Sequence, residues 1–318
     1  MSDWTLDPDT LSGLEGPDTS DLWNVDGSRR LDRLLAAASI ATRKDDPLVR
    51  WRDITIEVDQ RAISARLYEP SESSGPRGGV LFFHGGAFVF GTLESEHDRC
   101  VAWCRASGAL VLSVDYRLAP EFPFPAAVDD CRAAARWMTE HAEELRLDLA
   151  RWCVAGASAG GALAAGVAQW ARGTLGTPPC AQILIYPVLD DRATDGSAAT
   201  YFEGLSWDGR RGAKMWEIYL SDHLPNADAA PARAEDLRGL APAYFMVCEH
   251  DPLRDEALDY ARRLLDSGVE VELHLWPRAY HAVDVIAPDS RLARRAMREQ
   301  GEVLRRVVGP SDESTSSD

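Results

Sequence analysis

A serine flanked by glycines is the first feature of this sequence that could carry chemistry. Residues 156–160 read Gly-Ala-Ser-Ala-Gly, with Ser158 at the centre. The pattern follows an apolar run at residues 152–155 and opens an alanine-rich segment, which is the strand–turn–helix context of a nucleophile elbow. Bulk at either glycine would clash with the neighbouring strand and helix, and the helix N-terminus places N–H groups beside a developing oxyanion. We therefore predict that Ser158 is a nucleophile; the alternative is a glycine-rich helix start with an N-capping serine.

A second glycine-rich segment could stabilise the negative charge that such a nucleophile creates. Residues 84–87 read His-Gly-Gly-Ala and directly follow another apolar run, at residues 80–83. A loop of this kind supplies backbone N–H donors that complement the N–H of the residue after the serine. The alternative is an ordinary turn, and His84 is expected to hold the loop by hydrogen bonds rather than to transfer protons. The predicted oxyanion hole consists of the N–H groups of Gly85, Gly86, Ala87 and Ala159.

A serine nucleophile needs a base, and the base needs a carboxylate that orients it. In the strand–turn–helix arrangement the acid and then the histidine follow the serine along the chain. His281 lies in a loop after a predicted strand and before a predicted helix, where a base can reach across the edge of a sheet. We predict it as the base, in preference to the other histidines that follow the serine, His223, His250 and His274.

Two carboxylates compete for the role of the orienting acid. Asp251 and Asp255 both follow the apolar run at residues 244–248. Pro252 suits the first turn of a helix and disfavours helical geometry at the residue before it, so Asp251 should stay in the loop, where it can also cap the helix. Asp255 should lie inside the helix and pair with a neighbour such as Arg254. We therefore predict Asp251 as the acid.

The elements that must position these residues follow from the hydrophobic pattern. Polarity alternates at residues 51–58 and 62–68, which predicts an antiparallel strand pair. After that, short apolar runs alternate with helical stretches, which indicates a mostly parallel central sheet covered by helices on both faces. The later strands are predicted at residues 80–83, 110–114, 152–155, 183–186, 244–248 and 269–275. The helices are predicted at residues 29–42, 126–141, 159–172, 252–267 and 290–308.

The strand–helix rhythm fails between residues 190 and 238, and that segment is too long for a plain connection. We interpret it as a lid inserted in a catalytic domain that spans residues 49–308. Residues 1–48 are predicted to form an N-terminal segment of the same cap. The tail at 309–318 is rich in serine and acidic residues and is predicted to be disordered.

Four ordered motifs resemble the hormone-sensitive-lipase-like branch of the α/β-hydrolases, the bacterial family IV esterases. The motifs are HGGAFVFG at 84–91, DYRLAPEFPFPAAVDD at 115–130, GASAGG at 156–161 and EHDPLRDE at 249–256. The resemblance covers about residues 50–308. It implies an α/β-hydrolase fold with a mostly parallel sheet, flanking helices and a helical lid.

The same resemblance implies Ser158, Asp251 and His281 as the catalytic triad. It also implies an oxyanion hole from the loop after the first parallel strand together with the residue after the serine. The chain departs from the usual motifs at three positions, where alanine replaces a loop glycine, the aspartate inside the elbow and the glycine after the histidine; these are Ala87, Ala157 and Ala282. None of the three changes removes a catalytic functional group.

The charge balance excludes several classes of function. The 318 residues contain 34 Lys and Arg against 51 Asp and Glu, which gives a formal net charge of −17 at pH 7. A chain this acidic repels phosphate backbones and anionic membranes, so nucleic-acid binding is not expected. No run approaches the roughly 18 apolar residues of a membrane span, and no signal peptide is visible. The six cysteines form no CxxC pair, which favours buried thiols in a reducing cytoplasm.

These observations predict a cofactor-independent serine carboxylesterase that acts on a small ester of short to medium acyl chain through an acyl-enzyme intermediate. No metal is expected, because the chain has no HExxH motif and no paired Cys/His site. Phe88, Trp207 and Trp216 are candidates for the substrate pocket, although the two tryptophans could equally pack the lid. Two alternatives stay open: an amide or carbamate hydrolase or deacetylase with the same triad, and a non-catalytic binding protein, which the intact triad disfavours. The oligomeric state is open, with a homodimer as one option.

Overall fold

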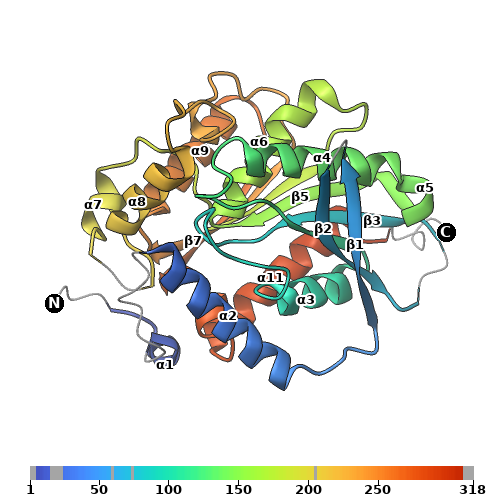
Figure 1. Cartoon of the computed structure of the whole chain (residues 1–318), viewed down its shortest axis with the longest axis horizontal. Helices are drawn as coiled ribbons and strands as arrows, with labels where there is room; N and C mark the ends of the chain where they lie inside the picture. The colour runs from blue at the N-terminus through green and yellow to red at the C-terminus, as the bar shows by residue number, and fades with distance from the viewer. Residues whose placement is uncertain (1–4, 15–23, 59–60, 73–74, 204–205, 311–318) are drawn as a thin grey trace, which may run out of the picture.

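The computed structural model of the chain describes residues 5–14, 24–58, 61–72, 75–203 and 206–310 (Figure 1). Most of the predicted tail, and residues 1–4 and 15–23 of the predicted N-terminal segment, lie outside the described residues. Within the described ranges, every helix is too short or too polar to cross a lipid bilayer.

In the described residues, eight strands form one sheet. The strands are β1 (Val49–Val58), β2 (Arg61–Pro70), β3 (Arg77–Phe83), β4 (Leu110–Asp115), β5 (Leu147–Ala157), β6 (Ala181–Ile185), β7 (Ala243–His250) and β8 (Val271–Tyr280). Their order across the sheet is β1-β2-β4-β3-β5-β6-β7-β8. Strand β2 is antiparallel to β1 and β4, and every other pairing is parallel. The predicted mostly parallel sheet is confirmed.

The helices lie mainly between consecutive strands, as expected for parallel pairing, which needs a crossover connection. The longer ones are α2 (Val25–Thr42), α3 (His97–Ser107), α4 (Ala126–Glu140), α6 (Ala159–Thr174), α8 (Gly209–Leu220), α9 (Arg254–Asp266) and α11 (Arg291–Val308). The short ones are α1 (Leu11–Leu14), α5 (Ala142–Leu145), α7 (Gly196–Thr200) and α10 (Val283–Ile286), with 3₁₀ turns at Pro8–Thr10 and Pro231–Arg233.

The helices cover the sheet in two layers, one on each face (Figure 1). Helices α4, α6 and α9 bury Val128, Leu163 and Tyr260 in one hydrophobic cluster. Helices α3 and α11 bury Trp103 and Leu304 in the other. Because helices exclude water from both faces, a central strand such as β3 is buried along its whole length and reads as a continuous apolar run.

Two elements differ from the prediction by more than their ends usually vary. Strand β8 continues to Tyr280 instead of ending at residue 275, because it pairs in parallel with β7 as far as His250. Pro277 lies inside β8, where the edge position tolerates its missing N–H. Strand β5 begins at Leu147, five residues before the predicted start, where Leu147 pairs with Arg77 of β3.

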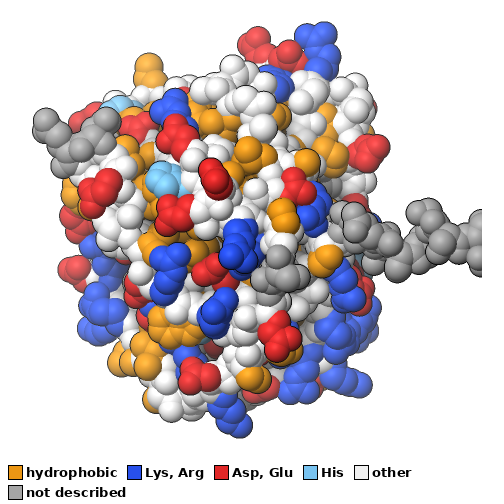
Figure 2. All heavy atoms as spheres, turned by 90° about the vertical axis from the view of Figure 1, so that its right-hand side faces the viewer, with side chains coloured by type: hydrophobic (Ala, Val, Ile, Leu, Met, Phe, Trp, Pro, Cys, Tyr) orange, Lys and Arg blue, Asp and Glu red, His pale blue; other side chains and the backbone are white. Residues whose placement is uncertain are grey.

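The acidic surplus is not concentrated on the face that carries α5 and the described C-terminal end. On this face, acidic and basic side chains alternate with scattered apolar ones, and no broad patch of a single charge is visible (Figure 2). Interspersed charges of both signs give weak local fields.

Candidate active site

The Gly-Ala-Ser-Ala-Gly segment forms the sharp turn between β5 and α6. Ser158 has φ 54° and ψ −117°, a conformation that residues with a side chain rarely adopt. A methyl group on Gly156 would overlap the carbonyl oxygen of Gly160, and one on Gly160 would overlap the carbonyl oxygen of Phe83. Both glycines are therefore required by close backbone approach, as the sequence predicted.

Three predicted residues meet in one hydrogen-bonded chain. Nε2 of His281 lies 3.0 Å from Oγ of Ser158, and Nδ1 of His281 lies 2.8 Å from Oδ2 of Asp251. The carboxylate can only accept, so it favours the tautomer with the proton on Nδ1 and leaves Nε2 as the acceptor for the serine hydroxyl. All three residues are buried, with exposed fractions of 8% or less.

The sheet brings these residues together from distant parts of the sequence. Ser158 follows the last residue of β5, Asp251 follows β7 and His281 follows β8. These strands run parallel, so their C-terminal ends lie along the same edge of the sheet, where ligand sites of such folds form. The extension of β8 to Tyr280 places His281 directly at this edge rather than in a longer loop.

The structure separates the two candidate acids. Oδ1 of Asp251 accepts from the N–H of Leu253 at 2.9 Å, which fixes the carboxylate while Oδ2 contacts the histidine. Asp255 instead accepts from Nε of Arg254 at 2.7 Å and from the N–H of Ser197 at 2.8 Å. Helix α9 begins at residue 254 rather than 252, so the expected capping of the helix by Asp251 is wrong; the carboxylate stabilises the preceding turn instead.

The loop after β3 lies directly against the elbow. A methyl group on Gly85 would come within 3.5 Å of Cβ of Ser158. Gly86 and Ala87 have φ of 123° and 55°, so the alanine adopts the left-handed conformation that the usual glycine would adopt without strain. Within the described residues, the N–H groups of Gly86, Ala87 and Ala159 make no hydrogen bond. They remain available for an oxyanion beside Ser158.

His84 holds this loop in place. Its ring stacks on Tyr116 with 4.2 Å between ring centroids, and its Nδ1 lies 2.6 Å from the carbonyl oxygen of Gly85. The hydroxyl of Tyr116 donates to the carbonyl of His84 at 2.8 Å. These contacts give His84 a structural position in the loop.

The remaining histidines lie apart from Ser158. Nδ1 of His274 contacts Glu299 at 2.6 Å, and Nδ1 of His250 contacts the hydroxyl of Tyr201 at 3.0 Å. His223 is exposed next to the end of α8.

The candidate pocket residues take different positions around α8. Trp207 lies 6.1 Å from His281 between ring centroids and lines a cavity of about 30 Å³ between α2, α8 and the loop that contains Ala87. Phe88 is 1% exposed and stacks on Tyr219 at 3.8 Å, so its ring packs against α8. Trp216 contacts the same ring stack from α8, 6.1 Å from Phe88. The aromatic residues thus join the loop after β3 to the segment that contains α8.

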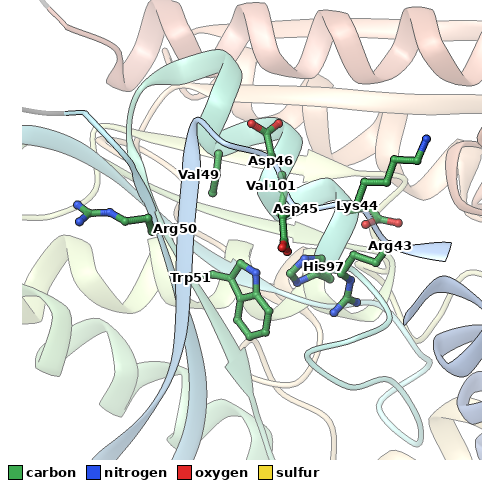
Figure 3. Close-up of a pocket in the computed structure, with 10 residues that line it drawn as sticks. Arg43, Lys44, Asp45, Asp46, Val49, Arg50, Trp51, His97 and Val101 are labelled. Carbon is green, nitrogen blue, oxygen red and sulfur yellow. The ribbon is translucent and has the colours of Figure 1, made fainter. Parts of the chain in front are cut away.

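A larger groove, of about 390 Å³, lies away from this chemistry (Figure 3). It runs between the segment before β1, which contributes Arg43, and helix α3, which contributes His97 and Val101. Trp51 and His97 meet edge to face in it, with 5.2 Å between ring centroids. None of the three hydrogen-bonded residues of the candidate active site lines this groove.

A buried charge cluster next to His281 was not predicted. The ring of Tyr186 contacts His281 at 4.8 Å between centroids, and its hydroxyl donates to Asp284 at 2.8 Å. Arg99 binds Asp284 at 3.0 Å, Glu96 at 2.7 Å and the hydroxyl of Tyr186 at 3.1 Å. Burial alone would raise the pKa of Asp284, but the guanidinium of Arg99 and the Tyr186 hydroxyl hold it below its usual range. Asp284 is therefore held as a carboxylate, and its bonds to Arg99 and Tyr186 anchor the turn that follows His281.

Replacing Arg99 by methionine should lower the free energy of unfolding by about 3–5 kcal/mol, because two buried carboxylates lose their cation. Urea unfolding followed by circular dichroism measures this loss. Arg105 on the same helix is 56% exposed and pairs with Asp46, so Arg105→Met should cost less than about 1 kcal/mol. Equal losses in the two variants would contradict the role given to the cluster.

Among the described residues, no group of three His, Cys, Asp or Glu side chains is arranged to hold a metal ion. The arrangement of Ser158, His281 and Asp251 is that of an acyl-transfer site, in which the serine attacks, the histidine moves its proton and backbone N–H groups stabilise the oxyanion.

Comparisons with known proteins identify the family of the chain. A family model described as the alpha/beta hydrolase fold matches residues 80–285. The chain is 41% identical over 236 residues to the esterase LipI of Mycobacterium tuberculosis, covering 72% of this chain and 73% of the relative. It is 33% identical to ethyl acetate hydrolase of Pseudomonas putida, over 76% of this chain and 78% of that protein. The solved structure of a bacterial heroin esterase matches with a TM-score of 0.91 at 36% identity, covering 96% of this chain and 99% of the other.

Proposed function

Because the chain belongs to the α/β-hydrolase fold family and is a carboxylic ester hydrolase, we propose that Ser158 is its nucleophile, His281 its general base and Asp251 the carboxylate that orients the histidine. The observation that carries this proposal is the hydrogen-bonded chain of 3.0 and 2.8 Å through His281. The relatives also confirm the resemblance to the hormone-sensitive-lipase-like esterases.

The reaction follows from the position of each group. Oγ of Ser158 attacks the ester carbonyl carbon while Nε2 of His281 takes the hydroxyl proton. The imidazolium then gives that proton to the leaving alkoxide, and the C–O bond breaks to leave an acyl-serine. Water, deprotonated by the same nitrogen, attacks the acyl carbon. The bond between that carbon and Oγ then breaks, the imidazolium returns the proton to Oγ of Ser158, and the carboxylic acid is released. Asp251 stabilises the imidazolium and keeps Nε2 directed at the serine in both halves of the reaction.

The tetrahedral intermediates of both halves carry a negative oxygen. We propose the N–H groups of Gly86, Ala87 and Ala159 as the donors to this oxygen, because the loop that contains the first two packs against Ser158 at Gly85. Ala159 directly follows the serine and is the first residue of α6, so the partial positive charge of that helix adds to the stabilisation. Each donor of this kind contributes about 10²–10³ in rate. Gly85 belongs to the same proposed oxyanion hole.

The inserted segment at 190–238 and the N-terminal helix α2 are proposed to form a cap over this site. Arg29 of α2 donates to the carbonyl of Val89 at 2.8 Å and to that of Ala119 at 3.1 Å. Helices α2 and α8 both line the small cavity beside Ala87. These contacts support a cap that packs against the loop that contains Ala87 and Val89.

The substrate is proposed to be a small ester with a short to medium acyl chain. The cavity of about 30 Å³ has room for one or two water molecules, so a long acyl chain would have to displace the cap. A relative named for ethyl acetate supports a small substrate.

For p-nitrophenyl esters of increasing length, kcat/KM should rise and then fall. Each methylene that fits the apolar pocket adds about 0.8 kcal/mol, or about a fourfold gain, until the pocket is full. Initial rates for acyl chains from acetyl to palmitoyl measure this profile. A curve that still climbs with emulsified long-chain lipid would contradict the proposal and indicate a true lipase.

The choice between ester and amide hydrolysis is tested by matched substrates. Phenyl butanoate and butananilide share the acyl group and differ in the leaving atom, so their ratio of kcat/KM reports the preference directly. Ser158→Ala serves as the blank for both. Faster turnover of the amide would favour the amidase alternative with the same triad.

Location and assembly are part of the proposal. All six cysteines are unpaired, five of them buried, which supports a reducing compartment such as the cytoplasm. The oligomeric state stays open, with a homodimer as one option.

A further inference from the structure

We propose that Trp207 determines specificity by donating its indole N–H to the substrate, which would therefore carry an acceptor oxygen besides its scissile ester group. This inference rests on the proposed function of Ser158 and deepens it. Nε1 of Trp207 is buried, yet it has no hydrogen-bond partner among the described residues. The ring stands 6.1 Å from that of His281 and lines the cavity beside Ala87.

The fully buried tryptophans of the chain provide a comparison for the unpaired indole N–H of Trp207. The indole N–H of Trp103 donates to Oε1 of Gln300 at 3.0 Å, and that of Trp152 donates to the carbonyl of Thr177 at 3.2 Å. Trp276 also lacks a partner, but it lies in β8, stacked on His274, and does not line the cavity. An unpaired buried donor destabilises the empty protein, so its position at a reaction site calls for an acceptor that arrives with the ligand.

Trp207 is held rigidly in relation to the catalytic histidine. The hydroxyl of Ser206 donates to the carbonyl of His281 at 2.7 Å. On the other side, Asp208 caps α8 by accepting from the N–H of Arg211 at 2.8 Å. The indole is thus fixed between the histidine loop and a capped helix, and a donor held in this way binds an acceptor without a large loss of side-chain entropy.

The surroundings of the indole favour an electron-rich group. The charged side chains that line the cavity are both cationic, and no described carboxylate lines it. Arg211 pairs with Asp208 and Lys214 with Glu217, and both of these carboxylates lie outside the lining. The remaining lining near Trp207 is largely apolar, with Val25, Phe90 and Met215 among its residues. An ether or carbonyl oxygen within a short, otherwise apolar chain matches both properties: its alkyl part fits the apolar wall and its oxygen accepts from the indole.

The test compares isosteric substrates that differ by one oxygen. On the acyl side, p-nitrophenyl methoxyacetate is compared with p-nitrophenyl butanoate; on the alcohol side, 2-methoxyethyl butanoate is compared with butyl butanoate. Each ratio of kcat/KM is divided by the ratio of hydroxide-catalysed rates, which removes the intrinsic reactivity. For the wild type, the corrected ratio should exceed one by about five- to a hundredfold on one of the two sides, since a site built around a hydrogen bond rejects the analogue that lacks it.

Trp207→Phe keeps the aromatic packing and removes only the N–H donor. In this variant the preference for the oxygen-bearing substrate should fall to near one, while turnover of the hydrocarbon analogue changes much less. Trp276→Phe removes the other unpaired indole N–H and should keep the wild-type ratio.

A corrected ratio near one on both sides in the wild type overturns the proposal, and so does an unchanged preference in a folded Trp207→Phe. Should that variant fail to fold by circular dichroism, the wild-type ratios alone decide. Activity retained by Ser158→Ala would instead overturn the proposed function, so the two failures are distinguishable.

Discussion

Replacing Ser158 by alanine should lower kcat for ester hydrolysis by about 10⁶-fold, because the covalent route is lost completely. His281→Ala should lose about as much, since the serine and the histidine act as one unit and either loss disables the other. A residual rate of about 10³-fold over water should remain from the oxyanion hole and substrate binding. Initial rates with p-nitrophenyl butanoate measure all three quantities.

A fluorophosphonate probe checks the same assignment by covalent labelling. Peptide mapping by mass spectrometry should find a single adduct, on Ser158, with turnover abolished in proportion to labelling. Ser113→Ala provides a matched control, because Ser113 is fully buried in β4, which β3 separates from the strand that carries Ser158. That variant should keep both labelling and activity; an adduct on another residue would contradict the assignment.

Replacing Asp251 by asparagine should reduce kcat by about 10⁴-fold with little change in the fold. The amide can present an N–H toward Nδ1 of His281, which stabilises the tautomer with the proton on Nε2. That nitrogen then cannot accept the proton of Ser158. Steady-state kinetics with folding checked by circular dichroism measures the effect.

Asp255→Asn is the matched control, because Asp255 lies only four residues after Asp251, at the start of α9. Asp255 binds Arg254 and the N–H of Ser197, so its loss should loosen the contact between α7 and α9 and lower kcat by less than about tenfold. If the two variants exchanged their effects while both stayed folded, Asp251 would not be the orienting acid.

The glycine requirements of the elbow were predictable because they are local. The clash that excludes a side chain at Gly156 arises with Gly160, only four residues away, and so is contained in the pentapeptide itself. The apolar runs of the parallel strands are equally readable, since burial on both faces needs apolar residues at every position. Most of these strands begin and end within four residues of the predicted positions.

The meeting of Ser158, Asp251 and His281 was predictable for a different reason. Each residue directly follows a strand of the parallel sheet, and parallel strands end along a common edge. The order of the strands in space did not have to be known for this, because all parallel strands of one sheet end at the same edge. In the structure, β5, β6, β7 and β8 are neighbours in that order.

The charge cluster around Arg99 of helix α3 was beyond the reach of the sequence. The partners of Arg99 in the cluster lie 87 residues away at Tyr186 and 185 residues away at Asp284. A charge with such partners is indistinguishable in the sequence from an ordinary surface arginine.

The sequence by itself determined the glycine-flanked turn at Ser158, the parallel sheet and the identity of the residues at its edge, because each depends on short-range sterics or on the periodicity of burial. Only the tertiary structure decided where the aromatic candidates for the substrate pocket lie. Phe88 is stacked into α8, whereas Trp207 stands beside His281 with an unpaired donor. Such positions depend on how the inserted segment packs against a loop more than 100 residues earlier, and close packing of distant segments leaves no periodic trace in the chain.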